Sequence, residues 1–140
     1  RLAVGGTYCG NAVGAAAAKA TLDILAETDA LAQIHARGTR LMQGLSEVLT
    51  EAGLEHEITG QPAMFGITLE PQERPVRDYR NTLASNGDLY ERIILAMRPR
   101  GVEVEPDWRE PFFLCAALTD ADVDATLNAA NDAIKEVKGR

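Results

Sequence analysis

The sequence predicts an α+β fold: a two-layer sandwich of a small, largely antiparallel sheet with helices on one face, preceded by a long connecting helix. Two observations support this class. Segments with apolar residues three and four positions apart, typical of helices, flank segments in which apolar and polar residues alternate, typical of half-buried strands. The chain is also 140 residues long with 46% hydrophobic residues. A domain of this size can bury a core without disulfides or metals.

The first predicted helix covers Ala12 to about Glu27. Alanine fills most of its first half, which therefore has a high helix propensity and no polar face. Asn11 is a suitable N-cap, and the glycine-rich segment Val4–Asn11 is expected to be a loop. A helix without a polar face is normally buried or covered by a partner. We therefore expect this helix to be a connector rather than part of the sandwich.

A second helix and a pair of strands should follow. The helix runs from Ala30 to about Ala52, where apolar residues recur at three- and four-residue spacing, and Gly53 provides its C-terminal stop. The strands are Glu55–Ile58 and Ala63–Leu69, joined through residues 60–62. The second strand alternates large apolar residues with other types, which is the period-2 pattern of a half-buried strand.

The second half of the chain is expected to contain four further segments. They are a polar connector over Pro71–Asp88, a helix from about Asp88 to Arg98, a short strand at Val102–Val104, and a central strand at Phe112–Ala116. Thr119 should cap the last helix, with Asp122 as its partner in a capping box. The predicted sheet therefore has three or four strands.

Composition excludes several classes of function. A net charge of -7 argues against a nucleic-acid-binding surface, which requires a basic excess. No apolar run is long enough to span a membrane. The two cysteines, Cys9 and Cys115, provide neither a disulfide framework nor a zinc site, and Cys115 is expected to be a small core residue. We expect no metal site, and a reducing, cytoplasmic location.

The segment Gly5–Asn11 is the best candidate for chemistry. It places glycines, a hydroxyl and the first amides of a helix together, which is a general arrangement for holding an anion such as phosphate. An ordinary capped loop is the simpler interpretation. Trp108 has two possible roles, as a lid over a pocket or as a plug against the sheet. Neither His35 nor His56 has a Cys or His at metal-ligand spacing.

Several segments in order resemble one family, the class III aminotransferases of the fold-type I enzymes that use pyridoxal 5'-phosphate (PLP), and within it the glutamate-1-semialdehyde 2,1-aminomutases. The similarity extends over nearly the whole chain. The matching segments are Gly6-Thr7-Tyr8-Cys9-Gly10-Asn11, Gly60-Gln61-Pro62-Ala63-Met64-Phe65-Gly66, Met97-Arg98-Pro99-Arg100-Gly101-Val102, Pro106 with Glu110, and Phe113 to Asp124.

The resemblance implies that this chain is the C-terminal portion of such an enzyme. Residues 1–29 would be a loop and connecting helix of the large-domain and interface region, and residues 30–140 the small C-terminal domain. Gly6 and Thr7 would bind the PLP phosphate of the neighbouring subunit in a homodimer, and Glu110 would lie near the entrance for a small, amino-acid-like substrate. The Schiff-base lysine would lie upstream, so that no catalytic residue belongs to this chain and the chain alone would be inactive.

The sequence departs from the family pattern at several positions. Cys9 stands in place of Ser, Leu118 in place of His, and Asp107 and Arg109 in place of Ser and Phe. A transaminase or racemase of the same class therefore stays open as the activity. A different class of function also stays open, namely a free-standing α+β interaction or regulatory domain whose alanine-rich first helix is a docking surface.

Overall fold

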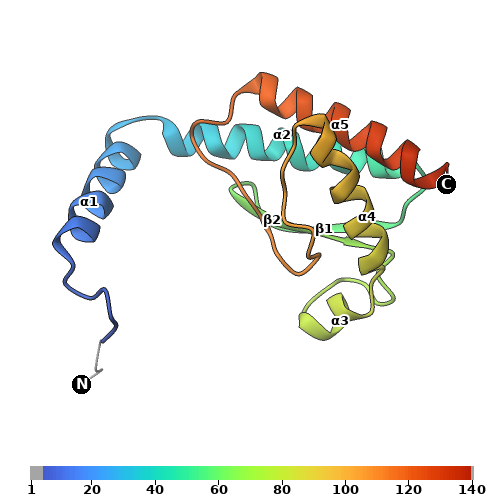
Figure 1. Cartoon of the computed structure of the whole chain (residues 1–140), viewed down its shortest axis with the longest axis horizontal. Helices are drawn as coiled ribbons and strands as arrows, with labels where there is room; N and C mark the ends of the chain where they lie inside the picture. Colours follow the sequence, from blue (N-terminus) through green and yellow to red (C-terminus); the bar gives the residue numbers. More distant parts are fainter. Residues whose placement is uncertain (1–4, 140) are drawn as a thin grey trace.

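The computed structural model describes residues 5–139, and Figure 1 shows the order of the elements along the chain. The elements are α1 (Ala12–Glu27), α2 (Ala30–Glu51), β1 (His56–Gln61), β2 (Met64–Leu69), α3 (Tyr79–Leu83), α4 (Gly87–Met97), the 3-10 helix η1 (Arg98–Arg100), β3 (Phe112–Phe113) and α5 (Asp120–Lys138).

The sheet within these residues is antiparallel and has the strand order β1-β2-β3. The strands β1 and β2 form a hairpin in which His56 faces Leu69 and Gln61 faces Met64. The hairpin turn therefore lies at residues 62–63, whereas the predicted connection is residues 60–62. The predicted two-layer α+β fold with an antiparallel sheet is confirmed.

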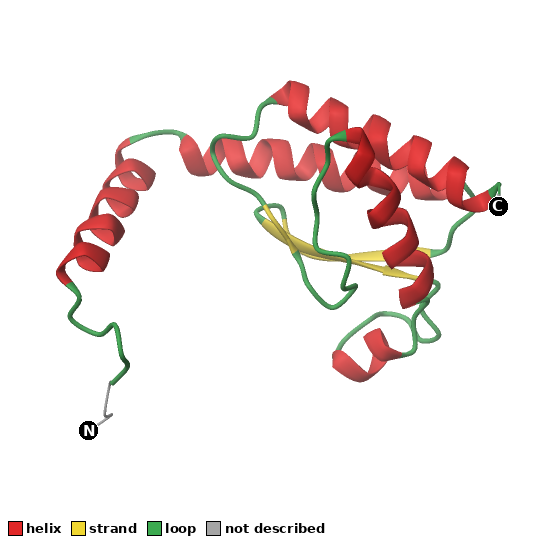
Figure 2. Cartoon of the chain, viewed as in Figure 1, coloured by secondary structure: helices red, strands yellow, loops and turns green. Residues whose placement is uncertain are grey.

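One face of the hairpin is covered by helices, as Figure 2 shows. The helix α2 packs against β1, α4 packs against β2, and α5 packs against both α2 and α4. Phe65 and Ile67 point into this layer and are buried, and the ring of Phe65 stacks on Phe112 with 5.0 Å between the ring centroids. The core thus lies between the helices and the face of β2 that carries Phe65 and Ile67.

The helix α1 stands apart from the sandwich (Figure 1) and has no buried residue. The side chain of Asn11 accepts a hydrogen bond of 2.8 Å from the backbone N–H of Gly14, which confirms the predicted N-cap. Leu22 and Ile24 are 64% and 56% exposed. Helix propensity and capping therefore define α1, and most of its apolar side chains are left uncovered by the other described residues.

The cap of α5 forms as the sequence predicts. The Thr119 side chain accepts a hydrogen bond from the backbone N–H of Asp122, and the Asp122 carboxylate accepts bonds from the Thr119 N–H at 2.8 Å and from its hydroxyl at 2.7 Å. The Thr119 hydroxyl hydrogen bond is the main reason that the pKa of Asp122 lies below its usual value. This capping box fixes where α5 begins.

Three local predictions are wrong. Val102–Val104 is not a strand, although Val102 and Val104 pack against the core, and Phe112–Ala116 is not a central strand. Only Phe112 and Phe113 pair, and they do so with β2 at the edge of the sheet. Because the chain leaves the sheet after Phe113, Cys115 is exposed rather than a core residue.

The polar connector over Pro71–Asp88 contains the short helix α3, which no apolar periodicity in the sequence predicts. Asp78 and Asn81 form a capping box around its first turn, so that local side-chain hydrogen bonds define this helix. In the part of the chain described by the structure, no helix has the length and apolar character needed to cross a membrane. The cytoplasmic location stays a prediction.

Candidate functional site

The first part of the candidate site is the loop before α1, which holds Gly6 and Thr7. Two backbone hydrogen bonds fold it into successive turns, from Cys9 N–H to the Gly6 carbonyl at 3.0 Å and from Asn11 N–H to the Tyr8 carbonyl at 3.1 Å. Gly10 has φ of 80°, a left-handed conformation that favours glycine. The turns place Thr7 on the surface, close in sequence to the positive end of the α1 dipole.

The chemistry of this loop fits a phosphate group. Thr7 is exposed, and its hydroxyl has no hydrogen-bond partner among residues 5–139. The segment from residue 5 to residue 22 contains no Asp or Glu, so that no carboxylate there repels an anion. A hydroxyl, exposed backbone amides and a helix N-terminus are the donors with which proteins bind phosphate.

The second part is the loop before β3, in which a tight turn presents Glu110. The Glu110 N–H donates to the Asp107 carbonyl at 3.0 Å, and the Arg109 N–H donates to the Asp107 side chain at 3.0 Å. The Arg109 guanidinium also binds both Asp107 carboxylate oxygens, with Nε at 2.7 and 3.0 Å and Nη2 in a further contact. Asp107 and Arg109 thus form a closed clamp, and Glu110 directly follows it.

The contact between Asp107 and Arg109 shifts the pKa values of both residues. Hydrogen bonds from the Arg109 side chain lower the pKa of Asp107 to about 2. The carboxylate of Asp107, followed by a hydrogen bond with Tyr79, raises the pKa of Arg109 above its usual value. At neutral pH the two charges therefore compensate each other.

Trp108 fixes the clamp to the body of the domain. Its ring lies against the backbone of Gly87 at the start of α4, where a Cβ on residue 87 would be 2.6 Å from the indole Cε3. The Arg109 guanidinium carbon lies 5.2 Å from the centre of the same ring, which is a cation–π distance. The indole Nε1 is buried and has no hydrogen-bond partner among the described residues. Trp108 therefore packs on the start of α4 and against the core, and its two possible roles, as a lid over a pocket or as a plug against the sheet, stay predictions.

A cavity of about 270 Å³ lies beside this loop. Met64, Gly66 and Thr68 line it; these residues alternate along β2 with the buried Phe65 and Ile67 and so point to the opposite face of the sheet. Phe65 and Ile67 also border the cavity, as do Thr59 and Gly60 of β1. The loop and α3 contribute the rest of the lining, through Thr82, Trp108, Arg109, Glu110 and Pro111. A larger groove of about 520 Å³ between the ends of α2 and α5 contains none of the predicted site residues.

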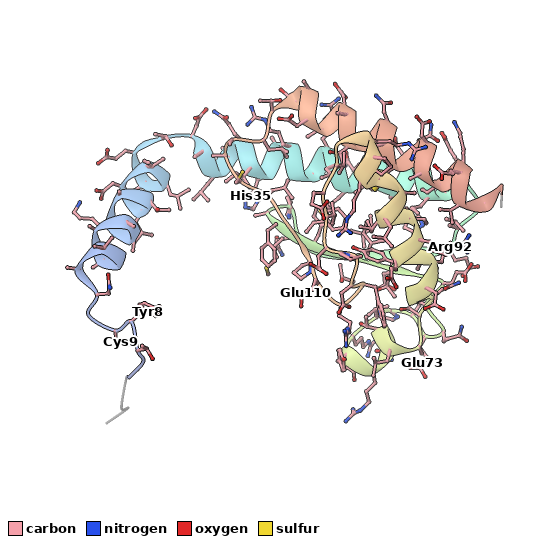
Figure 3. The ribbon with its side chains drawn as sticks, viewed as in Figure 1. Tyr8, Cys9, His35, Glu73, Arg92 and Glu110 are labelled. Atoms are coloured by element: carbon pink, nitrogen blue, oxygen red, sulfur yellow. The ribbon has the colours of Figure 1, made fainter. Side chains whose placement is uncertain are left out.

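The structure does not bring the two parts together within one chain. Figure 3 labels Tyr8 and Cys9, which follow Thr7, near the N-terminus, and it labels Glu110 below the sheet. Within residues 5–139 no group of three or more His, Cys, Asp and Glu side chains is placed to hold a metal ion. His35 is exposed, and His56 bonds the Ser46 hydroxyl through Nε2 and the Leu54 carbonyl through Nδ1.

Sequence reasoning identified Glu110 but missed the clamp next to it. In the sequence, Asp107 and Arg109 stand out only as departures from a family pattern. The spacing Asp-x-Arg was the available signal, because an Asp side chain commonly accepts a hydrogen bond from the backbone N–H two residues later. The contact between Trp108 and Gly87 had no sequence signal, since 21 positions separate the two residues.

Comparison with known proteins shows which family the sequence matches. The sequence matches the class-III aminotransferase family over residues 2–134. Glutamate-1-semialdehyde 2,1-aminomutase of Desulfitobacterium hafniense (strain Y51) is 33% identical over 132 residues, which are 94% of this chain and 30% of that protein.

Two solved structures show the same fold. A glutamate-1-semialdehyde aminomutase from Pseudomonas aeruginosa PAO1 aligns with a TM-score of 0.80 at 25% identity, over 97% of this chain and 31% of that one. The FumI protein of Sphingopyxis sp. MTA144, solved in its PLP internal aldimine form, aligns with a TM-score of 0.77 at 30% identity, over 99% of this chain and 30% of that one.

The chain therefore spans about 30% of the length of the relatives that it matches. The family match nonetheless extends along nearly all of its 140 residues, from the loop before α1 to the last helix. This chain belongs to the class-III aminotransferase family.

Proposed function

We propose that this chain is the C-terminal portion of a PLP-dependent aminotransferase or aminomutase that acts on an amino acid or amino-aldehyde. The observation that carries this proposal is the family match over residues 2–134, which includes the phosphate-compatible loop at Gly6 and Thr7. The PLP-containing form of the FumI relative supports PLP as the cofactor of the complete enzyme.

In the complete enzyme PLP, when bound, supplies an electron sink for the bond broken at the substrate carbon. The residues of this chain would bind and orient. The Thr7 hydroxyl would donate a hydrogen bond to a phosphate oxygen, and Gly6 would let the backbone approach that phosphate closely. Glu110 would contact substrate at the entrance, held by its turn with Asp107. The catalytic lysine would belong to the part of the enzyme upstream of these residues.

The two parts of the candidate site lie apart, which suits a dimer. In a homodimer Thr7 of one subunit would serve the cofactor of its neighbour, while Glu110 would face a substrate site formed with the large domain. Residues 1–29 would then belong with the large domain and the interface, and the uncovered apolar residues of α1, such as Leu22 and Ile24, would be buried there. Residues 30–140 would form the small domain.

The test compares this 140-residue chain with the complete enzyme. The complete enzyme should bind PLP and move an amino group between an amino acid and a keto acid, or within one molecule. The chain alone should do neither, and borohydride should fix no PLP on it. If the complete enzyme bound no PLP, or if the chain alone retained PLP after reduction, the proposal would be wrong.

An interaction or regulatory domain is the alternative function. It is supported by the exposed apolar side chains of α1, which could dock a protein partner. The sequence of the gene upstream of Arg1 distinguishes the two functions. The enzyme proposal requires a large domain that contains a lysine for the cofactor, whereas the alternative requires none.

A further inference from the structure

The cavity beside β2 has an uneven distribution of charge. Its lining contains two charged side chains, Arg109 and Glu110. Arg109 is already bound to both oxygens of Asp107 and lies against the ring of Trp108. Glu110, in contrast, has no ion-pair partner among residues 5–139. The uncompensated charge at the cavity is therefore negative.

The remainder of the lining is mostly apolar or small. Met64, Gly66, Trp108 and Pro111 contribute hydrocarbon or backbone surface, and the hydroxyls belong to threonines. A carboxylate entering this cavity would meet the Glu110 carboxylate and a guanidinium that is engaged elsewhere. Two like charges at a partly exposed site repel each other, and desolvation of a carboxylate without a partner adds to the cost.

We infer that this cavity accepts the apolar end of the amino substrate and rejects a carboxylate there. The Asp107–Arg109 clamp sets this specificity, because a guanidinium bound to Asp107 is not free to pair with a substrate carboxylate. The inference rests on the proposed function, because it requires the loop to face the substrate. A carboxylate elsewhere on the substrate is compatible with it. Asp107 and Arg109 are thus specificity-determining residues, and neither needs to touch the reacting atoms.

The test uses the complete enzyme loaded with PLP and three amines of similar length that differ at the far end. They are hexylamine, 6-aminohexanamide and 6-aminohexanoate. Their dissociation constants are measured from the absorbance change of the bound cofactor and, independently, from the shift in melting temperature. Hexylamine should bind roughly tenfold or more tightly than 6-aminohexanoate, the scale of one like-charge contact at a partly exposed site. The isosteric amide should lie between them.

Variants separate specificity from a merely structural role. Asp107→Asn releases Arg109, so that 6-aminohexanoate should bind several-fold more tightly and the ratio between hexylamine and 6-aminohexanoate should narrow. Adding Arg109→Gln to that variant should return the ratio between hexylamine and 6-aminohexanoate to its wild-type value. Glu110→Gln should also narrow this ratio, because the negative charge at the cavity is removed. A structural role alone would weaken all three amines equally and leave the ratio unchanged.

The outcomes are distinct from failure of the proposed function. If the complete enzyme transfers amino groups from some donor but binds 6-aminohexanoate as tightly as hexylamine, or binds none of the three amines, the inference is wrong and the proposed function stands. The inference would also be wrong if Asp107→Asn left the ratio of the dissociation constants of hexylamine and 6-aminohexanoate unchanged. If the complete enzyme binds no PLP and transfers no amino group, the proposed function itself has failed.

Discussion

Gly38 of α2 lies against the carbonyl group of Pro62 in the β1–β2 turn, so closely that a Cβ on residue 38 would be 2.0 Å from the Pro62 oxygen. This contact sets how near α2 approaches the hairpin. Because β2 both faces the core and lines the cavity, the same contact helps to place the candidate substrate surface.

Gly38→Ala should therefore destabilise the domain. The obstacle is backbone, which moves less readily than a side chain, and overpacking of this kind costs about 1–3 kcal/mol. The better helix propensity of alanine returns at most about 1 kcal/mol of that loss. Urea unfolding followed by circular dichroism should show a lower midpoint for the variant.

Gly44→Ala is the matched control in the same helix. A Cβ there would lie 2.6 Å from Cδ1 of Leu127, which is the end of a flexible side chain and can move aside. Its unfolding free energy should stay within about 1 kcal/mol of the wild type, because the gain in helix propensity offsets the adjustment. Equal losses in both variants would contradict the argument from the Pro62 backbone.

The capping box of α5 supports a second prediction. Thr119→Ala removes the oxygen that accepts from the Asp122 N–H and should lower the free energy of unfolding by about 0.5–2 kcal/mol. Thr126→Ala, in the same helix, is the control, since the Thr126 hydroxyl donates only to the Asp122 carbonyl one turn earlier. Chemical denaturation of both variants should show the larger loss at Thr119; a larger loss at Thr126 would refute the assignment of the cap.

The clamp predicts how stability changes in acid. The pKa of Asp107 is about 2 in the folded chain, against about 3.9 for an unperturbed Asp. A lowered folded pKa contributes stability that is present above about pH 3.9 and is lost as the pH falls toward about 2. Between these values the free energy of unfolding of the wild type should fall more steeply than that of Asp107→Asn. Parallel curves from pH 5 to 2 would show that the clamp does not couple to folding.

Trp108 supports a prediction about an unpaired polar atom. Because the indole Nε1 is buried without a partner among the described residues, Trp108→Phe sacrifices no hydrogen bond. It keeps an aromatic ring against Gly87 and loses only the packing of the smaller ring, so that it should cost less than Trp108→Ala. Trp108→Ala loses the packing on Gly87 and should cost about 2 kcal/mol or more. Thermal unfolding compares the two. A phenylalanine variant as unstable as the alanine variant would reveal a hydrogen bond at Nε1.

Local rules predicted most of the fold. Periodicity and capping residues located α1, α2, α4 and α5, since these signals lie within a few residues of each helix end. They failed where distant parts of the chain decide the outcome. Val102–Val104 alternates like a strand but packs on the core without pairing in the sheet, and Phe112–Ala116 is apolar yet leaves the sheet edge after two residues.

The candidate site was predictable to a different extent. Thr7 and Glu110 came from the resemblance to a family, because a single hydroxyl or carboxylate in a loop has no distinctive local pattern. The engagement of Arg109 depends on side-chain geometry with Asp107, and its attachment depends on the packing of Trp108 on Gly87. Sequence spacing indicates which residues can meet in a turn, but only the folded chain shows which charges remain uncompensated.

The affinity of the complete enzyme for PLP, compared between wild type and Thr7→Val, tests the central claim most directly. Loss of one hydrogen bond to a charged group costs about 1.5–3 kcal/mol, so that PLP should bind roughly 10- to 100-fold more weakly to the variant. Thr39→Val, on the exposed surface of α2, is the control, since its hydroxyl donates only to the His35 carbonyl within the helix, and it should bind PLP as the wild type does. Unchanged affinity in the Thr7 variant would contradict the assignment of this loop to the cofactor phosphate.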